Sequence, residues 1–160
     1  MQDDQNDINK YTKQCEEYIT QKESVVPQIL SLREQLKEKE LELKSKYAVL
    51  NRLKSQRQNK KAQLQTQGLP IYKNDELTKI QAELDKINAE ISDLIGQISH
   101  IKSQISILET KIKTYNEMLE QAEELKKTFE REYKKNETQF KEDILSQITS
   151  LFTINDEKSK

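Results

Sequence analysis

The sequence predicts an all-α protein built as a long antiparallel helical hairpin, in which two coiled-coil arms pack against each other. The 160 residues are 34% charged and 33% hydrophobic, with only two glycines, two prolines and no tryptophan. So few glycines and prolines argue against the many turns of a sheet-rich fold or a loop-built active site. Long helices are favoured instead, because the chain is rich in the good helix formers Glu, Lys, Gln and Leu.

The one strong break in the helical pattern is the segment QTQGLPIYKNDE, from Gln65 to Glu76. Gly68 can adopt the left-handed conformation that ends a helix, and Pro70 follows where a helix cannot continue. Asn74 or Asp75 can then accept backbone N–H bonds and cap a second helix. We therefore predict a short turn at residues 66–75, between a first arm at 1–65 and a second arm at 76–152.

Each arm carries apolar residues at alternating steps of three and four, which is the spacing of the a and d positions of a coiled coil. We call this row of positions the seam. A period of about 3.5 residues over this length predicts a left-handed supercoil. In the first arm the seam comprises Ile8, Tyr11, Cys15, Tyr18, Lys22, Val25, Ile29, Leu32, Leu36, Lys39, Leu43, Lys46, Leu50, Leu53, Arg57, Lys60 and Leu64. In the second arm it comprises Leu77, Ile80, Leu84, Ile87, Ile91, Leu94, Ile98, Ile101, Ile105, Leu108, Ile112, Tyr115, Leu119, Ala122, Lys126, Phe129, Tyr133, Asn136 and Phe140.

The two seams match when the chain is folded at the turn. Placing Leu64 opposite Leu77 also puts Leu50 opposite Ile91, and it keeps apolar rows together back to Ile8. The turn therefore has the right length for an antiparallel hairpin within one chain.

All non-apolar seam positions of the first arm are basic, namely Lys22, Lys39, Lys46, Arg57 and Lys60. In a parallel homodimer each would face its own copy, whereas in the hairpin its methylene stem can lie along the apolar second arm. In the hairpin register, acidic residues of the second arm lie nearby: Glu83 and Asp85 for Arg57, Glu90 and Asp93 for Lys46, and Glu117 and Glu120 for Lys22. The alternative is that basic residues are merely tolerated in a weak seam.

Pro27 interrupts the pattern of the first arm. A proline donates no helical hydrogen bond and clashes with the preceding turn. We expect either a kink in a continuous helix or a break at residues 24–27, after which Pro27 restarts the helix.

Little in the chain indicates chemistry. His100 is the only histidine and Cys15 the only cysteine, and no phosphate-binding loop or metal motif is present. We expect no catalytic residue, metal or cofactor, and no small-molecule substrate.

The formal net charge of −1 gives no general attraction to nucleic acid, so a nucleic-acid-associated scaffold is the least favoured function. The start MQDDQNDINK is acidic and resembles neither a secretory nor a mitochondrial leader, and no apolar run is long enough to span a membrane. The predicted location is cytoplasmic, associated with the cytoskeleton, or nuclear.

Two surfaces are candidates for binding a partner. Halfway along the hairpin, small residues replace charged ones on the back of the second arm, with apolar residues beside them and on the first arm at the same height. We predict a docking zone for a third or fourth helix there, against the alternative of a Ser- and Gln-tolerant solvent face. The predicted partner-binding residues of this zone are Leu41, Tyr47, Ile95, Gly96, Ser99, Ser103 and Ile107.

The second candidate lies beyond the end of the first arm. Near Phe140 the pattern takes extra steps of four, a stutter that locally unwinds a supercoil. An apolar stripe with no partner in the hairpin implies an external partner, and its mixed polar face favours a protein over a membrane. The predicted contacts are Phe140, Ile144, Ile148 and Phe152, with residues 153–160 as a disordered tail.

The composition resembles that of small coiled-coil subunits of large assemblies, such as cytoskeletal, ciliary, kinetochore or messenger-ribonucleoprotein export complexes. The resemblance implies a non-catalytic structural subunit that assembles with other coiled-coil chains, as a hetero-oligomer rather than a parallel homodimer. The alternative is a coiled-coil tether or a chaperone-like client-binding module. A prefoldin-like chaperone would need β-hairpins between its helices, and the turn is too short for them.

Overall fold

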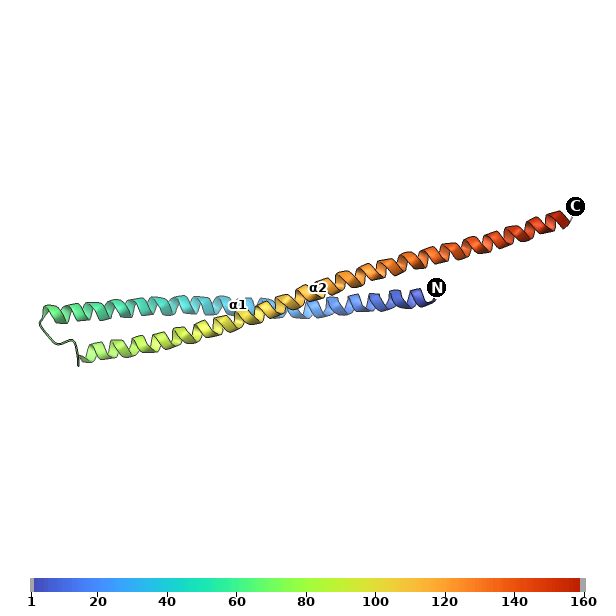
Figure 1. Ribbon diagram of the computed structural model, residues 1–160. Helices are drawn as coiled ribbons and strands as arrows, with labels where there is room; N and C mark the ends of the chain where they lie inside the picture. The colour runs from blue at the N-terminus through green and yellow to red at the C-terminus, as the bar shows by residue number, and fades with distance from the viewer. Residues whose placement is uncertain (1, 159–160) are drawn as a thin grey trace. The chain divides into compact units, whose positions relative to one another are not determined.

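The computed structural model describes residues 2–158, with side chains for residues 5–152. It contains two helices, α1 (Gln2–Thr66) and α2 (Asp75–Lys158), and no strand among the described residues (Figure 1). The predicted all-α hairpin is therefore confirmed.

The chain divides into two compact units. The turn unit is Val26–Thr110, and the terminal unit combines Met1–Val25 with Lys111–Lys160. Each unit contains one segment of α1 and one of α2, and each is described by itself below.

The turn joins the helices through residues 67–74, close to the predicted range. Gly68 has a φ of 70°, and the amide of Leu69 donates to the carbonyl of Leu64 at 2.9 Å. The amide of Gly68 donates to the carbonyl of Gln65 at 3.1 Å, which completes a Schellman motif. At the start of α2, Asn74 rather than Asp75 is the cap, because its Oδ1 accepts from the amide of Leu77 at 3.1 Å.

The core of the turn unit is the seam. Leu50 and Leu53 of α1 pack with Leu84 and Ile91 of α2 in one buried cluster. Leu43, Val49, Ile80 and Ile87 pack against this cluster. Leu50 and Ile91 thus share the core as the predicted register requires.

Burial follows the predicted seam as far as Tyr133. Every buried apolar side chain occupies one of the predicted seam positions: Cys15, Val25, Ile29, Leu50, Leu53, Leu64, Leu77, Leu84, Ile91, Leu94, Ile98, Ile101, Ile105 and Ala122.

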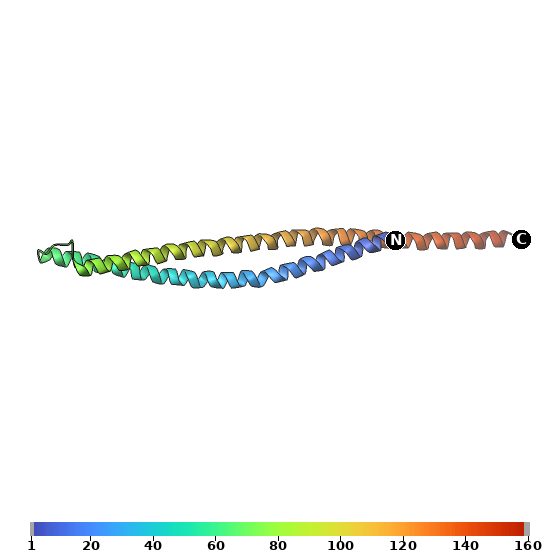
Figure 2. The same cartoon turned by 90° about the horizontal axis from the view of Figure 1, so that it is seen from below.

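In the terminal unit, the start of α1 packs on the middle of α2. The rings of Tyr11 and Phe129 stack with centroids 5.6 Å apart, and Cys15 and Ala122 are buried. The seam slips earlier than predicted, because Asn136 is exposed and Glu137 is half-buried instead. After residue 137 every described side chain of α2 is exposed, and both views show α2 extending past the start of α1 (Figures 1 and 2).

Pro27 lies inside α1, so the expected break at residues 24–27 is absent and the alternative of a continuous helix is observed. The proline leaves one backbone carbonyl without its helical donor. Val25 and Ile29 on either side are both buried in the seam, and this packing supports the helix across the missing bond.

The helix α2 also continues beyond residue 152 to Lys158, where a disordered tail was predicted. The sequence after Phe152 contains no glycine or proline that would end a helix. Residues 159–160 of the predicted tail lie outside the described residues.

The two glycines should respond oppositely to substitution by alanine. Gly68→Ala puts a side chain into the left-handed region and should destabilise the chain by about 1 kcal/mol. Gly96→Ala should stabilise it by about 1 kcal/mol, because Gly96 is mid-helix and an added Cβ would meet nothing within 4 Å. Urea unfolding followed by circular dichroism measures both changes. A destabilising Gly96→Ala would mean that this face packs against something in the purified protein.

Candidate functional site

The lone cysteine, Cys15, lies in the terminal unit, and the lone histidine, His100, lies in the turn unit. Among the described residues, no group of three or more His, Cys, Asp or Glu side chains could hold a metal ion. His100 is exposed on α2. Cys15 is buried, and burial followed by the charge of Glu123 raises the pKa of its thiol, against the opposing effect of Lys126. A raised pKa reduces the thiolate fraction at neutral pH and so lowers reactivity.

Cross-helix ion pairs follow one side of the seam in the turn unit. Arg33 pairs with Glu109 at 2.7 Å. One heptad nearer the turn on each helix, Glu40 lies 4.0 Å from Lys102. These residues occupy the positions that flank the seam, where coiled coils place interhelical ion pairs. We call this series of positions the flanking ladder.

The next step of the flanking ladder is apolar. Seven residues beyond Glu40 and Lys102 stand Tyr47 and Ile95, which are 42% and 47% exposed. The steps beyond are polar again, with Lys54 and Asn88. Tyr47 and Ile95 therefore replace an ion pair with two exposed apolar side chains, and we call them the apolar step.

The other predicted docking residues do not all join this surface. Gly96, Ser99 and Ser103 are exposed on the back of α2, and Leu41 is exposed on the back of α1. Ile107 lies toward the opposite side of the seam from Ile95, because its heptad position adjoins the other flank. The predicted docking zone is thus divided between two sides of the turn unit.

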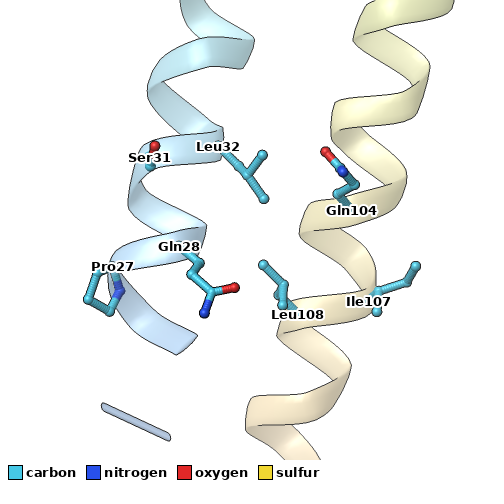
Figure 3. A pocket seen from close by; sticks show the side chains of 7 residues that line it. All are labelled: Pro27, Gln28, Ser31, Leu32, Gln104, Ile107 and Leu108. Atoms are coloured by element: carbon cyan, nitrogen blue, oxygen red, sulfur yellow. The ribbon is translucent and has the colours of Figure 1, made fainter. Parts of the chain in front are cut away.

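Ile107 lines a shallow open groove between α1 and α2 (Figure 3). Leu32 and Leu108 point toward each other across it, and Pro27 of α1 is among its lining residues. The remaining lining residues are Gln28, Ser31 and Gln104. None of the lining residues is titratable, so the groove can hold an apolar side chain but offers no acid or base.

Two ion pairs between α1 and α2 involve seam lysines of the turn unit. Lys46 Nζ lies 2.8 Å from Glu90 Oε2, as predicted, and Lys60 pairs with Glu76 at 2.6 Å. The hydrogen bond from Lys46 lowers the pKa of Glu90, and the bond from Lys60 lowers that of Glu76. The bond to Glu90 in turn raises the pKa of Lys46.

The other predicted seam contacts differ. Arg57 donates to Gln81 at 3.0 Å rather than to Glu83 or Asp85, and Gln81 donates onward to Asp85. Lys39 pairs with Glu42 of its own helix at 3.8 Å. The Lys60–Glu76 pair was not predicted. Glu76 lies in the first turn of α2, where an acidic side chain also interacts favourably with the helix dipole.

The predicted stripe near the end of α2 is exposed as expected. Phe140, Ile144, Ile148 and Phe152 are 55%, 40%, 43% and 66% exposed. Leu145 and Leu151 widen it. We call these six residues the tail stripe.

Sequence reasoning missed several exposed apolar residues beside the seam. Four of them could have been found by searching the flanking positions of each heptad as well as the seam: Ile19, Val26, Met118 and Leu125. Leu30, directly after the seam residue Ile29, lies outside these positions.

No family model matches the chain, and no curated protein and no solved structure matches it significantly. No described helix is both long and apolar enough to cross a membrane.

The Lys46–Glu90 pair should make stability depend on pH. Because the folded pKa of Glu90 lies below its ordinary 4.5, the pair stabilises the fold above that pH, and this stability is lost as pH falls through the folded value. Glu90→Gln should therefore flatten the decline of unfolding free energy on the acid side. Urea unfolding between pH 7 and pH 3 tests this.

Glu83→Gln, an exposed glutamate for which the described structure shows no ion pair, is the matched control. An equal flattening in both variants would contradict a specific role of Glu90.

Proposed function

We propose that this chain is a non-catalytic coiled-coil structural subunit that assembles with other helical chains in a larger multiprotein complex. The observation that carries the proposal is the apolar step, in which the exposed Tyr47 and Ile95 follow the Arg33–Glu109 and Glu40–Lys102 ion pairs along the flanking ladder. A third helix on that side would cover both side chains, as the flanking positions do in coiled coils of more than two helices.

The back of α2 beside the apolar step supports close approach. Gly96 has no contact within the chain that requires a glycine, since an added Cβ would meet nothing within 4 Å. A glycine inside a helix costs about 1 kcal/mol relative to alanine. Because Gly96 has no side chain and stands next to Ile95, it would allow the backbone of another helix to approach closely.

The narrow core points the same way. A seam between two helices leaves its own members partly exposed, and ordering each residue costs roughly 1–2 kcal/mol in backbone entropy. Additional helices would bury the exposed apolar residues and stabilise the hairpin by mass action. The proposed partners are other coiled-coil proteins, in a hetero-oligomer of cytoplasmic, cytoskeletal or nuclear location, and neither catalysis nor nucleic-acid binding forms part of the proposal.

A second candidate function rests on the tip of the turn unit. Leu69 and Tyr72 are 51% and 75% exposed at the connection between the helices. An apolar tip on a helical arm suits a tether or a client-binding module, which would engage its target end-on. Binding that is lost in Leu69→Ser and Tyr72→Ser but retained in Ile95→Lys would favour this function.

The structural proposal predicts the behaviour of Ile95→Lys. Losing the burial of one aliphatic side chain costs roughly 1.5–3 kcal/mol, so partner affinity should fall about 10-fold or more. The tagged full chain would be recovered from cells of its own source, and co-purifying chains would be quantified against the bait. A photo-cross-linker at Tyr47 would then identify the chain that covers the apolar step.

Asn88→Lys is the matched control, because Asn88 is exposed at the same heptad position one heptad away. It should keep the wild-type partner, and both variants should keep wild-type helix content. A chain that purifies as a lone monomer, or a partner held equally by Ile95→Lys, would overturn the proposal.

A further inference from the structure

The part of the turn unit nearest the turn carries an excess of positive charge. From Leu43 to Asn74 the chain contains no acidic residue, although acidic residues slightly outnumber basic ones in the whole chain. The start of α2 offsets only part of this charge, because residues 75–98 contain six acidic and two basic residues. Residues 43–98 therefore have a formal net charge of +4. The eight basic residues of the first stretch are Lys44, Lys46, Arg52, Lys54, Arg57, Lys60, Lys61 and Lys73.

An open hollow in this region is lined by part of the excess charge. Its lining residues come from α1, from the turn and from the start of α2, and the charged ones are Arg57, Lys61, Lys73 and Asp85. We call it the basic hollow. Lys61 and Lys73 are exposed, and neither forms an ion pair with another described residue. The basic hollow thus combines three cations with one carboxylate.

The guanidinium of Arg57 is already held in one position. Its Nη1 donates to Gln81 Oε1 at 3.0 Å, and Gln81 Nε2 donates to Asp85 Oδ1 at 3.0 Å. Because Gln81 is neutral, the first contact orients Arg57 without cancelling its charge. A guanidinium has five N–H donors in a planar fork, so most of them remain for a carboxylate. A side chain that is already oriented loses less freedom when it binds.

Apolar side chains line the same hollow. Leu77 is buried, Ile71 is half-buried, and Tyr72 is 75% exposed. Cations beside an exposed aromatic ring suit a ligand that carries carboxylates next to an apolar group. A polypeptide can vary its side chains in this way. The evenly charged backbone of a nucleic acid fits less well, because it would also bring phosphates close to Asp85.

We propose that the basic hollow binds an acidic segment of a partner protein, whose carboxylates pair with Arg57, Lys61 and Lys73 and whose apolar side chain packs on Tyr72. The proposal rests on the second candidate function and deepens it, because it names the kind of target that the tip would engage. It does not depend on the apolar step, which lies outside the hollow. Charge complementarity also accelerates the encounter with an acidic partner.

Fluorescence anisotropy of the full chain with a labelled peptide tests the class of ligand. The acidic peptide carries Asp and Glu around a single Phe, and the control peptide carries Asn and Gln in their place. The wild type should bind the acidic peptide about tenfold or more tightly than the control peptide. Its affinity should fall as the salt concentration rises, because salt screens exposed charges.

Charge reversal tests the site. Lys61→Glu combined with Lys73→Glu should weaken binding of the acidic peptide by about tenfold or more, because two attractive contacts become repulsive. Lys44→Glu combined with Lys54→Glu is the matched control, since it changes the net charge equally at exposed positions of α1 outside the hollow. The control should weaken binding by less than about threefold. Circular dichroism should show wild-type helix content in both double variants.

Equal affinity for the two peptides, or equal losses in the two double variants, would overturn the proposal. An oligouridine that binds the wild type more tightly than the acidic peptide at the same salt concentration would also overturn it, and would assign the basic hollow to nucleic acid.

Failure of this proposal is distinguishable from failure of the proposed functions. A target that is lost in Leu69→Ser and Tyr72→Ser but kept in the Lys61→Glu, Lys73→Glu double variant would leave the second candidate function standing and show that the acidic ligand is wrong. The same double variant should still recover a hetero-partner through the apolar step. Ile95→Lys should still bind the acidic peptide.

Discussion

The seam between α1 and α2 is one residue wide, and the rest of the structure depends on this constraint. Within the turn unit, Leu50, Leu53, Leu84 and Ile91 fill the space between the helices and leave no second apolar layer. Any apolar side chain next to the seam, such as Tyr47 or Ile95, is therefore exposed unless another helix covers it. The groove near Leu32 and Leu108 in the turn unit is accordingly shallow and open.

Charged residues favour the antiparallel orientation of the two helices, which hydrophobic packing along the seam alone would not strongly determine. The basic seam residues Lys46 and Lys60 form ion pairs with carboxylates of the opposing helix, at 2.8 Å and 2.6 Å. Exposed ion pairs contribute little stability, but the same charges would repel each other in a parallel homodimer. Their main effect is thus to select the antiparallel arrangement.

The sequence was sufficient for the helices, the turn and the seam, because a period of 3.5 residues and a Gly-Leu-Pro stop are local signals. It was insufficient where neighbouring packing outweighs local preference. Pro27 weakens a helix in isolation, yet Val25 and Ile29 hold α1 together on both sides. Arg57 donates to Gln81, which in turn donates to Asp85, and residue spacing alone does not reveal such a relayed contact. The predicted docking residues Ile95 and Ile107 lie on opposite sides of the seam because of their heptad positions. Assigning a heptad position to every residue would therefore have predicted this division from the sequence.

The capped turn has a topological consequence. Two chains that exchanged their second helices would bury the same seam as two separate hairpins, so packing does not favour either arrangement. The choice falls to residues 67–74, where Gly68 and Lys73 both take positive φ values of 70° and 61°. An opened turn would relieve the strain at Lys73, which is roughly 1–2 kcal/mol for a residue with a side chain, but it would lose the Schellman bonds and the Asn74 cap. The single-chain hairpin is already favoured at low concentration because its two helices are covalently linked, and the hydrogen bonds of the turn add to this preference.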